Sequence, residues 1–101
     1  MARLARSKVA GMYTIRPIKH KMQIAAENDL PAAHFAKLPG AFLDIERSPY
    51  SHPDGLIELI RSGRYKGSWH YRLNGGYRFH YTVDESEKLI RITYIGPHPK
   101  Y

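Results

Sequence analysis

The chain has 101 residues, enough for a single domain with a modest hydrophobic core. Hydrophobic residues make up 43% of it, which excludes disorder throughout, and the absence of cysteine excludes a disulfide framework and a thiol nucleophile. Lys and Arg number 16 against 9 Asp and Glu, and this net charge of +7 predicts an acidic partner, either nucleic acid or an acidic protein. No apolar run approaches the roughly 18 residues of a membrane span, and residues 1–11 lack the apolar core of a secretory signal, so we expect a cytoplasmic protein with no membrane partner.

The first elements predicted along the chain are a short strand and a helix. Residues 12–17 predict a strand that stops at Pro17, because proline is confined to sheet edges and strand ends. Ala, Met, Gln and Glu are frequent in residues 19–29 and favour a helix over residues 19–28.

A second helical stretch follows. Asp29 is a candidate N-cap residue for it, with Pro31 in its first turn. An apolar stripe at helical spacing then consists of His34, Phe35, Leu38, Phe42 and Ile45. Because Pro39-Gly40 interrupts this stripe, we expect a kink or two short helices that end near Arg47.

The middle of the chain is a loop followed by an ambiguous stretch. Residues 48–55 hold two prolines, an aspartate and a glycine, which indicates a loop. Residues 56–60 are compatible with a helical turn or with an extended connector, and the sequence leaves both open.

Two runs with alternating polarity flank Asn74-Gly75-Gly76 and predict a β-hairpin. A three-residue loop pairs Leu73 with Tyr77 and keeps every large apolar group on one face. These apolar residues are Trp69, Tyr71, Leu73, Tyr77, Phe79, Tyr81 and Val83.

The polar face of this hairpin carries two pairs of like side chains. The same register sets Arg72 directly across from Arg78 and His70 across from His80. Like charges in direct opposition destabilise a sheet. An anion between two arginines makes their juxtaposition stabilising, because each arginine then donates charge-assisted hydrogen bonds to it. We therefore expect a phosphate site on this face, with splaying of both arginines into water as the alternative.

A third strand is predicted over residues 89–95, after an acidic loop. Ile90, Ile92 and Tyr94 are expected in the core, which leaves Arg91 and Thr93 on the basic face. The predicted fold class is therefore α+β: an N-terminal edge strand, two helices on one face of the sheet, then a three-stranded antiparallel meander.

Residues 61–83 contain five basic residues, two histidines and six aromatic residues but no acid. Cations interleaved with aromatic rings are typical of surfaces that bind single-stranded nucleic acid, since bases stack and phosphates need positive charge. An aromatic β-core with a solvated basic face explains the same composition, and both interpretations stay open at this point.

Several runs of the second half resemble one family. They are Gly67-Ser-Trp-His-Tyr-Arg-Leu73, Gly76-Tyr-Arg-Phe-His-Tyr81, Ile92-Thr-Tyr-Ile-Gly96 and His98-Pro-Lys-Tyr101. Together they resemble the RelE/ParE toxin superfamily over residues 49–101. The resemblance implies a RelE-like fold over residues 12–101, with residues 1–11 as an N-terminal extension that has no role in the fold.

The resemblance also implies a function: the toxin of a type II toxin–antitoxin system, an mRNA interferase that cuts mRNA on the ribosome and is inhibited by a cognate antitoxin. Neither a metal nor another cofactor is implied. The alternatives are a gyrase inhibitor, as in the ParE branch, and a non-catalytic RNA-binding member of the family.

Carried over position by position, the resemblance implies that Arg78 acts on the scissile phosphate, that His98 serves proton transfer, and that His70 and Arg72 hold positions where RNase members place basic residues. The chemistry of metal-free cleavage then assigns His98 as general acid and His70 as base, with Arg78 and Arg72 stabilising the charge on the phosphate. Tyr101 would stack on a base of the mRNA. Further RNA contacts are expected from Lys66, Arg64, Arg91 and His80. The chain departs from the family's pattern because residues 61–83 hold no carboxylate, where some members have a glutamate as general base.

Overall fold

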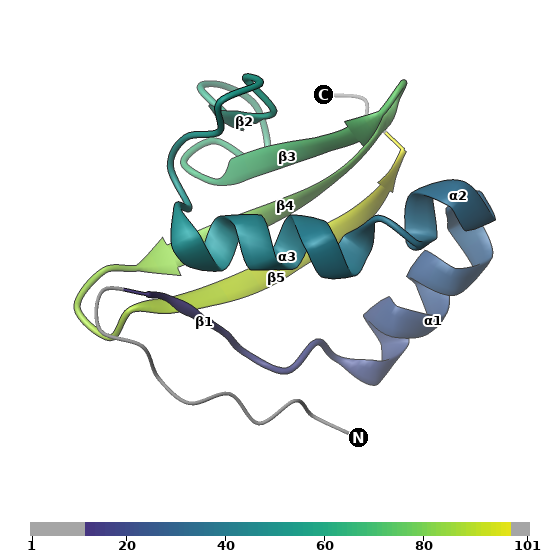
Figure 1. The fold of residues 1–101 in the computed structure, drawn as a ribbon, viewed down its shortest axis with the longest axis horizontal. Helices are drawn as coiled ribbons and strands as arrows, with labels where there is room; N and C mark the ends of the chain where they lie inside the picture. The colour runs from purple at the N-terminus through teal and green to yellow at the C-terminus, as the bar shows by residue number, and fades with distance from the viewer. Residues whose placement is uncertain (1–11, 98–101) are drawn as a thin grey trace.

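The computed structural model describes residues 12–97. They form a five-stranded mixed sheet with helices on one face (Figure 1). The strand order across the sheet is β1-β5-β4-β3-β2, with β1 parallel to β5 and all other neighbours antiparallel. The strands are β1 (Thr14–Ile15), β2 (Ile57–Leu59), β3 (Trp69–Asn74), β4 (Tyr77–Asp84) and β5 (Leu89–Pro97). The predicted α+β class, with an N-terminal edge strand and a C-terminal meander, is confirmed.

Within residues 12–97, three helices precede the meander: α1 (His20–Asp29), α2 (Ala32–Phe35) and α3 (Leu38–Arg47). Figure 1 shows α3 crossing the sheet, with α1 and α2 at the end of the sheet near β5. The predicted division of the second helical stretch into two short helices that end near Arg47 is confirmed, but the break lies at residues 36–37, and Pro39-Gly40 is part of α3. Pro39 lies in the first turn of α3, where its missing N–H leaves no hydrogen bond unmade. Among residues 12–97, no helix is long and apolar enough to cross a membrane.

The assignment of Asp29 as an N-cap was wrong. Asp29 is the last residue of α1, and Pro31 takes the N-cap position of α2. Leu30 between them is extended, with ψ of 136°. The reason is steric, because a proline ring disfavours the helical conformation of the residue before it.

The core lies between α3 and the sheet and is rich in aromatic rings. Phe79 is fully buried, stacks on Tyr71 at 5.2 Å between ring centroids and meets Phe42 of α3 edge-on at 5.1 Å. Tyr81 is also fully buried, and its hydroxyl donates to the carbonyl oxygen of Pro49 at 2.5 Å. The loop before β2 is thereby tied to the centre of the sheet.

The hairpin has the predicted register except at its tip. Trp69 lies opposite Tyr81 and Tyr71 opposite Phe79, as expected. The predicted pair of Leu73 with Tyr77 is wrong, because Asn74 pairs with Tyr77 across a two-residue turn, with an irregularity between residues 72 and 74. Gly75 has φ of 51° and so supplies the left-handed conformation that such a tight turn needs.

Strand β5 contains a second irregularity that changes which residues face the core. Tyr81 pairs with Ile92 and His80 pairs with Tyr94, so Thr93 is an extra residue between them. The prediction that Tyr94 joins the core was therefore wrong. Tyr94 lies on the opposite face of the sheet, and Ile95 takes the core position opposite Phe79.

Candidate functional site

The face of the sheet away from the helices carries most of the side chains singled out by the sequence. We call it the open face; its members include Glu58, His70, Arg72, Arg78, His80, Thr82, Arg91 and Tyr94. The register sets four of them in one row across the sheet, since Glu58 of β2 pairs with His70, His70 with His80, and His80 with Tyr94. Arg72 and Arg78 face each other in the next row, as predicted.

His70 joins a carboxylate to a guanidinium. Its Nε2 lies 3.2 Å from Oε1 of Glu58, and its Nδ1 lies 3.0 Å from Nη1 of Arg78. A guanidinium can only donate, so Nδ1 accepts from Arg78 and the hydrogen of Nε2 points to Glu58. This chain of contacts requires a neutral His70 with its proton on Nε2.

The surroundings of His70 favour the same neutral state. Burial lowers the pKa of His70 below its usual value, and the positive charge of Arg78 lowers it further, against the opposing attraction of Glu58. The side chain of His70 is only 9% exposed, whereas that of Glu58 is 61% exposed. The imidazole is therefore a fixed, uncharged link, and the carboxylate at its end reaches solvent.

Glu58 is a residue that the sequence analysis missed. The stretch 61–83 contains no carboxylate, but β2 brings one to the same face from outside that stretch. A signal was present, because Ile57-Glu58-Leu59 alternates apolar and polar residues as a half-buried strand does. Three residues are too short a run to separate that pattern from a helical turn.

His80 lies at the centre of the open face, but the rings of Tyr65 and Tyr94 cover it. It is fully buried, with its ring centroid 4.7 Å from that of Tyr65 and 5.1 Å from that of Tyr94. Tyr65 belongs to the loop between β2 and β3. Two backbone hydrogen bonds between Ile60 and residues 67–68 close this loop. Contact of His80 with RNA stays a prediction, and it requires that Tyr65 move aside.

Arg72 and Arg78 are held by different acceptors. The Nη2 of Arg72 donates to the carbonyl oxygen of Gly55 at 3.0 Å, while Arg78 donates to His70. Arg72 is exposed and Arg78 is half-buried, so both cations remain near the surface beside Glu58. The structure thus brings His70, Arg72 and Arg78 together and adds Glu58 to them.

Comparisons with known proteins find similarity at the level of structure. No protein-family model and no curated protein matches the sequence. Among solved structures, the archaeal RelE–RelB complex from Pyrococcus horikoshii OT3 contains a chain that is 22% identical, with a TM-score of 0.68 over 89% of this chain and 99% of that one. The toxin–antitoxin complex RelBE2 from Mycobacterium tuberculosis is 22% identical, with a TM-score of 0.63 over 85% and 98%. The YoeB dimer from Staphylococcus aureus is 24% identical, with a TM-score of 0.60 over 89% and 100%.

The chain has the RelE/ParE toxin fold. The predicted resemblance is thereby confirmed for the fold. On this RelE-like sheet, Arg91 lies apart from the cluster of Glu58, His70 and Arg78. It pairs with Thr82, which is four residues beyond Arg78 on β4, a separation of about 13 Å along the strand.

The other predicted site residues belong to the loop between β2 and β3 or lie outside the described residues. Arg64 and Lys66 are exposed on the loop that carries Tyr65. His98 and Tyr101 lie outside the described residues, which end at Pro97, where β5 pairs with Tyr77. Within residues 12–97, no three His, Asp or Glu side chains gather as a metal site would require.

Proposed function

We propose that this chain is the toxin of a toxin–antitoxin pair and that it cleaves mRNA on the ribosome without a metal. The observation that carries this proposal is the chain of contacts from Glu58 through His70 to Arg78, with Arg72 alongside, on the open face of a RelE-like sheet. This cluster brings an exposed carboxylate together with two permanent cations. A carboxylate can accept a proton, and the cations can bind a phosphate beside it.

The reaction would be attack of a ribose 2′-oxygen on the adjacent phosphorus. The O2′–P bond forms and the P–O5′ bond breaks, which leaves a 2′,3′-cyclic phosphate on one fragment and a 5′-hydroxyl on the other. The step needs a base for the 2′-hydroxyl, positive charge for the pentavalent phosphorane, and an acid for the departing 5′-oxygen.

Glu58 suits the role of base better than His70. Both ring nitrogens of His70 are engaged, so the imidazole has no lone pair for a substrate proton while these contacts last. The Oε2 of Glu58 accepts no hydrogen bond within residues 12–97 and is available for the 2′-hydroxyl. In this proposal Glu58 takes the proton, and His70 is a positioning residue that holds Glu58 beside Arg78.

Arg78 and Arg72 would stabilise the negative charge that grows on the phosphate oxygens. Each can donate charge-assisted hydrogen bonds from a planar fork that fits phosphate geometry. For the proton of the leaving group we retain His98, which follows Pro97 in the sequence and lies outside the described residues. Tyr101 stays the candidate for stacking on a base, and Arg64 and Lys66 for contacts with the RNA backbone.

An acidic antitoxin is the protein partner that we propose. Several of the similar structures are toxin–antitoxin complexes, including those from Pyrococcus horikoshii OT3 and Mycobacterium tuberculosis. The net charge of +7 favours an acidic chain as the partner here.

The test is induction of the chain alone in a bacterial host, with growth and the positions of mRNA cuts as readouts. We expect growth arrest with cuts in translated messages, and relief of both by Glu58→Gln, Arg78→Ala or His98→Ala. A matched control is Lys37→Ala, which removes an exposed cation on the helix side and should leave toxicity unchanged. Thermal melting of each purified variant checks that the fold is intact.

Three outcomes would contradict the proposal. Full toxicity of Glu58→Gln and Arg78→Ala would remove the chemistry argued above. DNA damage that precedes the halt of translation would favour a gyrase inhibitor. Binding of RNA without cleavage, even on translating ribosomes, would favour a non-catalytic RNA-binding protein.

A further inference from the structure

A second pair of arginines lies on the open face, at the edge where β1 meets β5. Arg91 of β5 pairs with Thr82, and the backbone N–H of Arg16 donates to the carbonyl oxygen of Ile90 at 2.9 Å. This bond continues the parallel ladder of β1 and β5 and brings Arg16 alongside Arg91. Both side chains are exposed, and neither forms an ion pair with an acidic group within residues 12–97.

Two adjoining hollows share these arginines. The first, of about 490 Å³, lies on the open face and is lined by Arg16, Arg91, Thr82, Thr93 and Asp84, among others. The second, of about 300 Å³, continues round the sheet edge and adds Lys19 to Arg16, Arg91 and Thr93. The lining therefore offers three cations and two hydroxyl groups to one ligand.

Asp84 is the one acid among the described residues that line either hollow. Its Oδ1 already accepts hydrogen bonds from the hydroxyl of Ser86 at 2.8 Å and from the backbone N–H of Glu87 at 3.1 Å. The net charge of the lining is positive, and Arg16 beside Arg91 is a juxtaposition of like charges that destabilises a sheet unless an anion lies between them.

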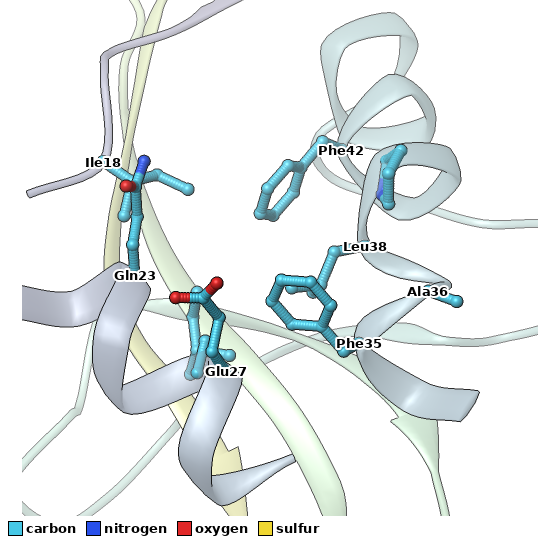
Figure 2. Close-up of a pocket in the computed structure, with 10 residues that line it drawn as sticks. Ile18, Gln23, Glu27, Phe35, Ala36, Leu38 and Phe42 are labelled. Carbon is cyan, nitrogen blue, oxygen red and sulfur yellow. The ribbon is translucent and has the colours of Figure 1, made fainter. Parts of the chain in front are cut away.

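The chemistry of the lining favours phosphate over an apolar ligand. Guanidinium forks and threonine hydroxyls are donors that phosphate oxygens accept. The hollow between α1 and α3 makes the contrast: Figure 2 shows Phe35, Leu38 and Phe42 on one side and Glu27 with Gln23 on the other, with no cation among its described lining residues.

We infer that Arg16 and Arg91 form a second phosphate subsite, which holds the backbone of the RNA strand whose scissile phosphate lies at Arg72 and Arg78. This inference rests on the proposed function. The two arginine pairs lie on one face, about 13 Å apart along β4, a distance that a few nucleotides span. Tyr65 lies between them, over His80 and Tyr94, and the guanidinium of Arg64 lies 5.8 Å from the centroid of its ring.

The test uses RNA that cannot be cleaved because every 2′-hydroxyl is methylated. A decanucleotide can reach both arginine pairs, whereas a dinucleotide, with a single phosphodiester, can occupy one of them. We expect Arg16→Gln with Arg91→Gln to weaken binding of the decanucleotide by about tenfold or more. The logarithm of the association constant falls linearly with the logarithm of the salt concentration. The slope of this line should become shallower by about 0.7 for each phosphate that the variant no longer neutralises. The weakening for the dinucleotide should be several-fold smaller.

The matched control is Lys37→Gln with Arg47→Gln, which removes the same charge from exposed positions on the helix side. Equal weakening by this control would overturn the subsite in favour of net charge alone. The subsite is also overturned if the arginine variant binds the decanucleotide as tightly as the wild type does. Displacement of the RNA by poly-L-glutamate at the same concentration as by unlabelled RNA would overturn it too, because that result would indicate an acidic protein as the occupant. Absence of RNA binding by the wild type overturns it too.

Two further arms keep the outcomes separate. If the double variant melts early, Arg91→Gln alone repeats the measurement. Cleavage is scored independently with unmodified mRNA on ribosomes. A wild type that binds through both arginine pairs but does not cut would contradict the nuclease and leave the subsite standing.

Discussion

The two faces of the sheet are built from alternate residues of the same strands, yet they satisfy their polar groups in opposite ways. On the helix face, the hydroxyl of Tyr71 donates to Oδ2 of Asp44 at 2.6 Å, and the hydroxyl of Tyr81 donates to Pro49, so polar atoms serve to fasten helix and loop. On the open face, His70 is held between Glu58 and Arg78, two groups that keep their charges near water. Alternation along β3 and β4 thus separates the residues that hold the fold from those suited to chemistry.

The largest effect that tests this comparison is expected at the centre of the helix face. Phe79→Ala removes a fully buried ring that contacts Phe42 and Tyr71, and we expect it to lower the free energy of unfolding by about 3–5 kcal/mol. Urea denaturation measures it. Thr82→Ala, an exposed position on the same strand, is the control and should stay within about 0.5 kcal/mol of the wild type. A small loss for Phe79→Ala would place the core elsewhere.

An intermediate effect is expected where the helix face fastens α3. Tyr71→Phe removes the donor to Asp44, a hydrogen bond to a charged group, and should lower the free energy of unfolding by about 1–2 kcal/mol. Tyr77→Phe is the matched control, because the Tyr77 hydroxyl makes no hydrogen bond within the described residues. Equal losses in the two variants would show that the bond to Asp44 does not fasten the helix.

The smallest effect concerns the open face and appears as pH dependence. Because the pKa of His70 is lowered in the folded chain, the unfolded chain binds the proton more tightly, and the contribution of His70 to stability is full above the unfolded pKa of about 6.5. It declines as the pH falls below that value. We expect His70→Asn to flatten this decline in thermal melts between pH 7 and pH 5, whereas His20→Asn, at an exposed position of α1, keeps it. An unchanged slope in His70→Asn would mean that His70 is not held neutral.

The sequence was most informative where alternation is long and uninterrupted. The facing pairs of Arg72 with Arg78 and His70 with His80 followed from polarity alone, because one register keeps the aromatic rings on one face. The prediction failed at Tyr94, since an extra residue in a strand reverses the alternation beyond it, and the adjacent apolar residues Tyr94 and Ile95 leave open which of them faces the core.

The candidate site was only partly predictable. His70, Arg72 and Arg78 were recognised from the hairpin and from the family resemblance. Glu58 was missed because its strand has three residues, and such a short run takes its structure from pairing with β3 rather than from its own sequence. The pairing of Arg16 with Arg91 depends on a parallel contact between distant segments, for which local patterns give no signal.

The extra residue in β5 also bears on how related chains should be aligned. Thr93 separates Ile92, which faces the core opposite Tyr81, from Tyr94, which faces His80. A strand without Thr93 would place Ile92 and Tyr94 on these same two faces with an unbroken ladder. This point of β5 therefore accommodates a one-residue difference in length without exchanging the roles of its neighbours, and an alignment without a gap here would pair core residues with site residues.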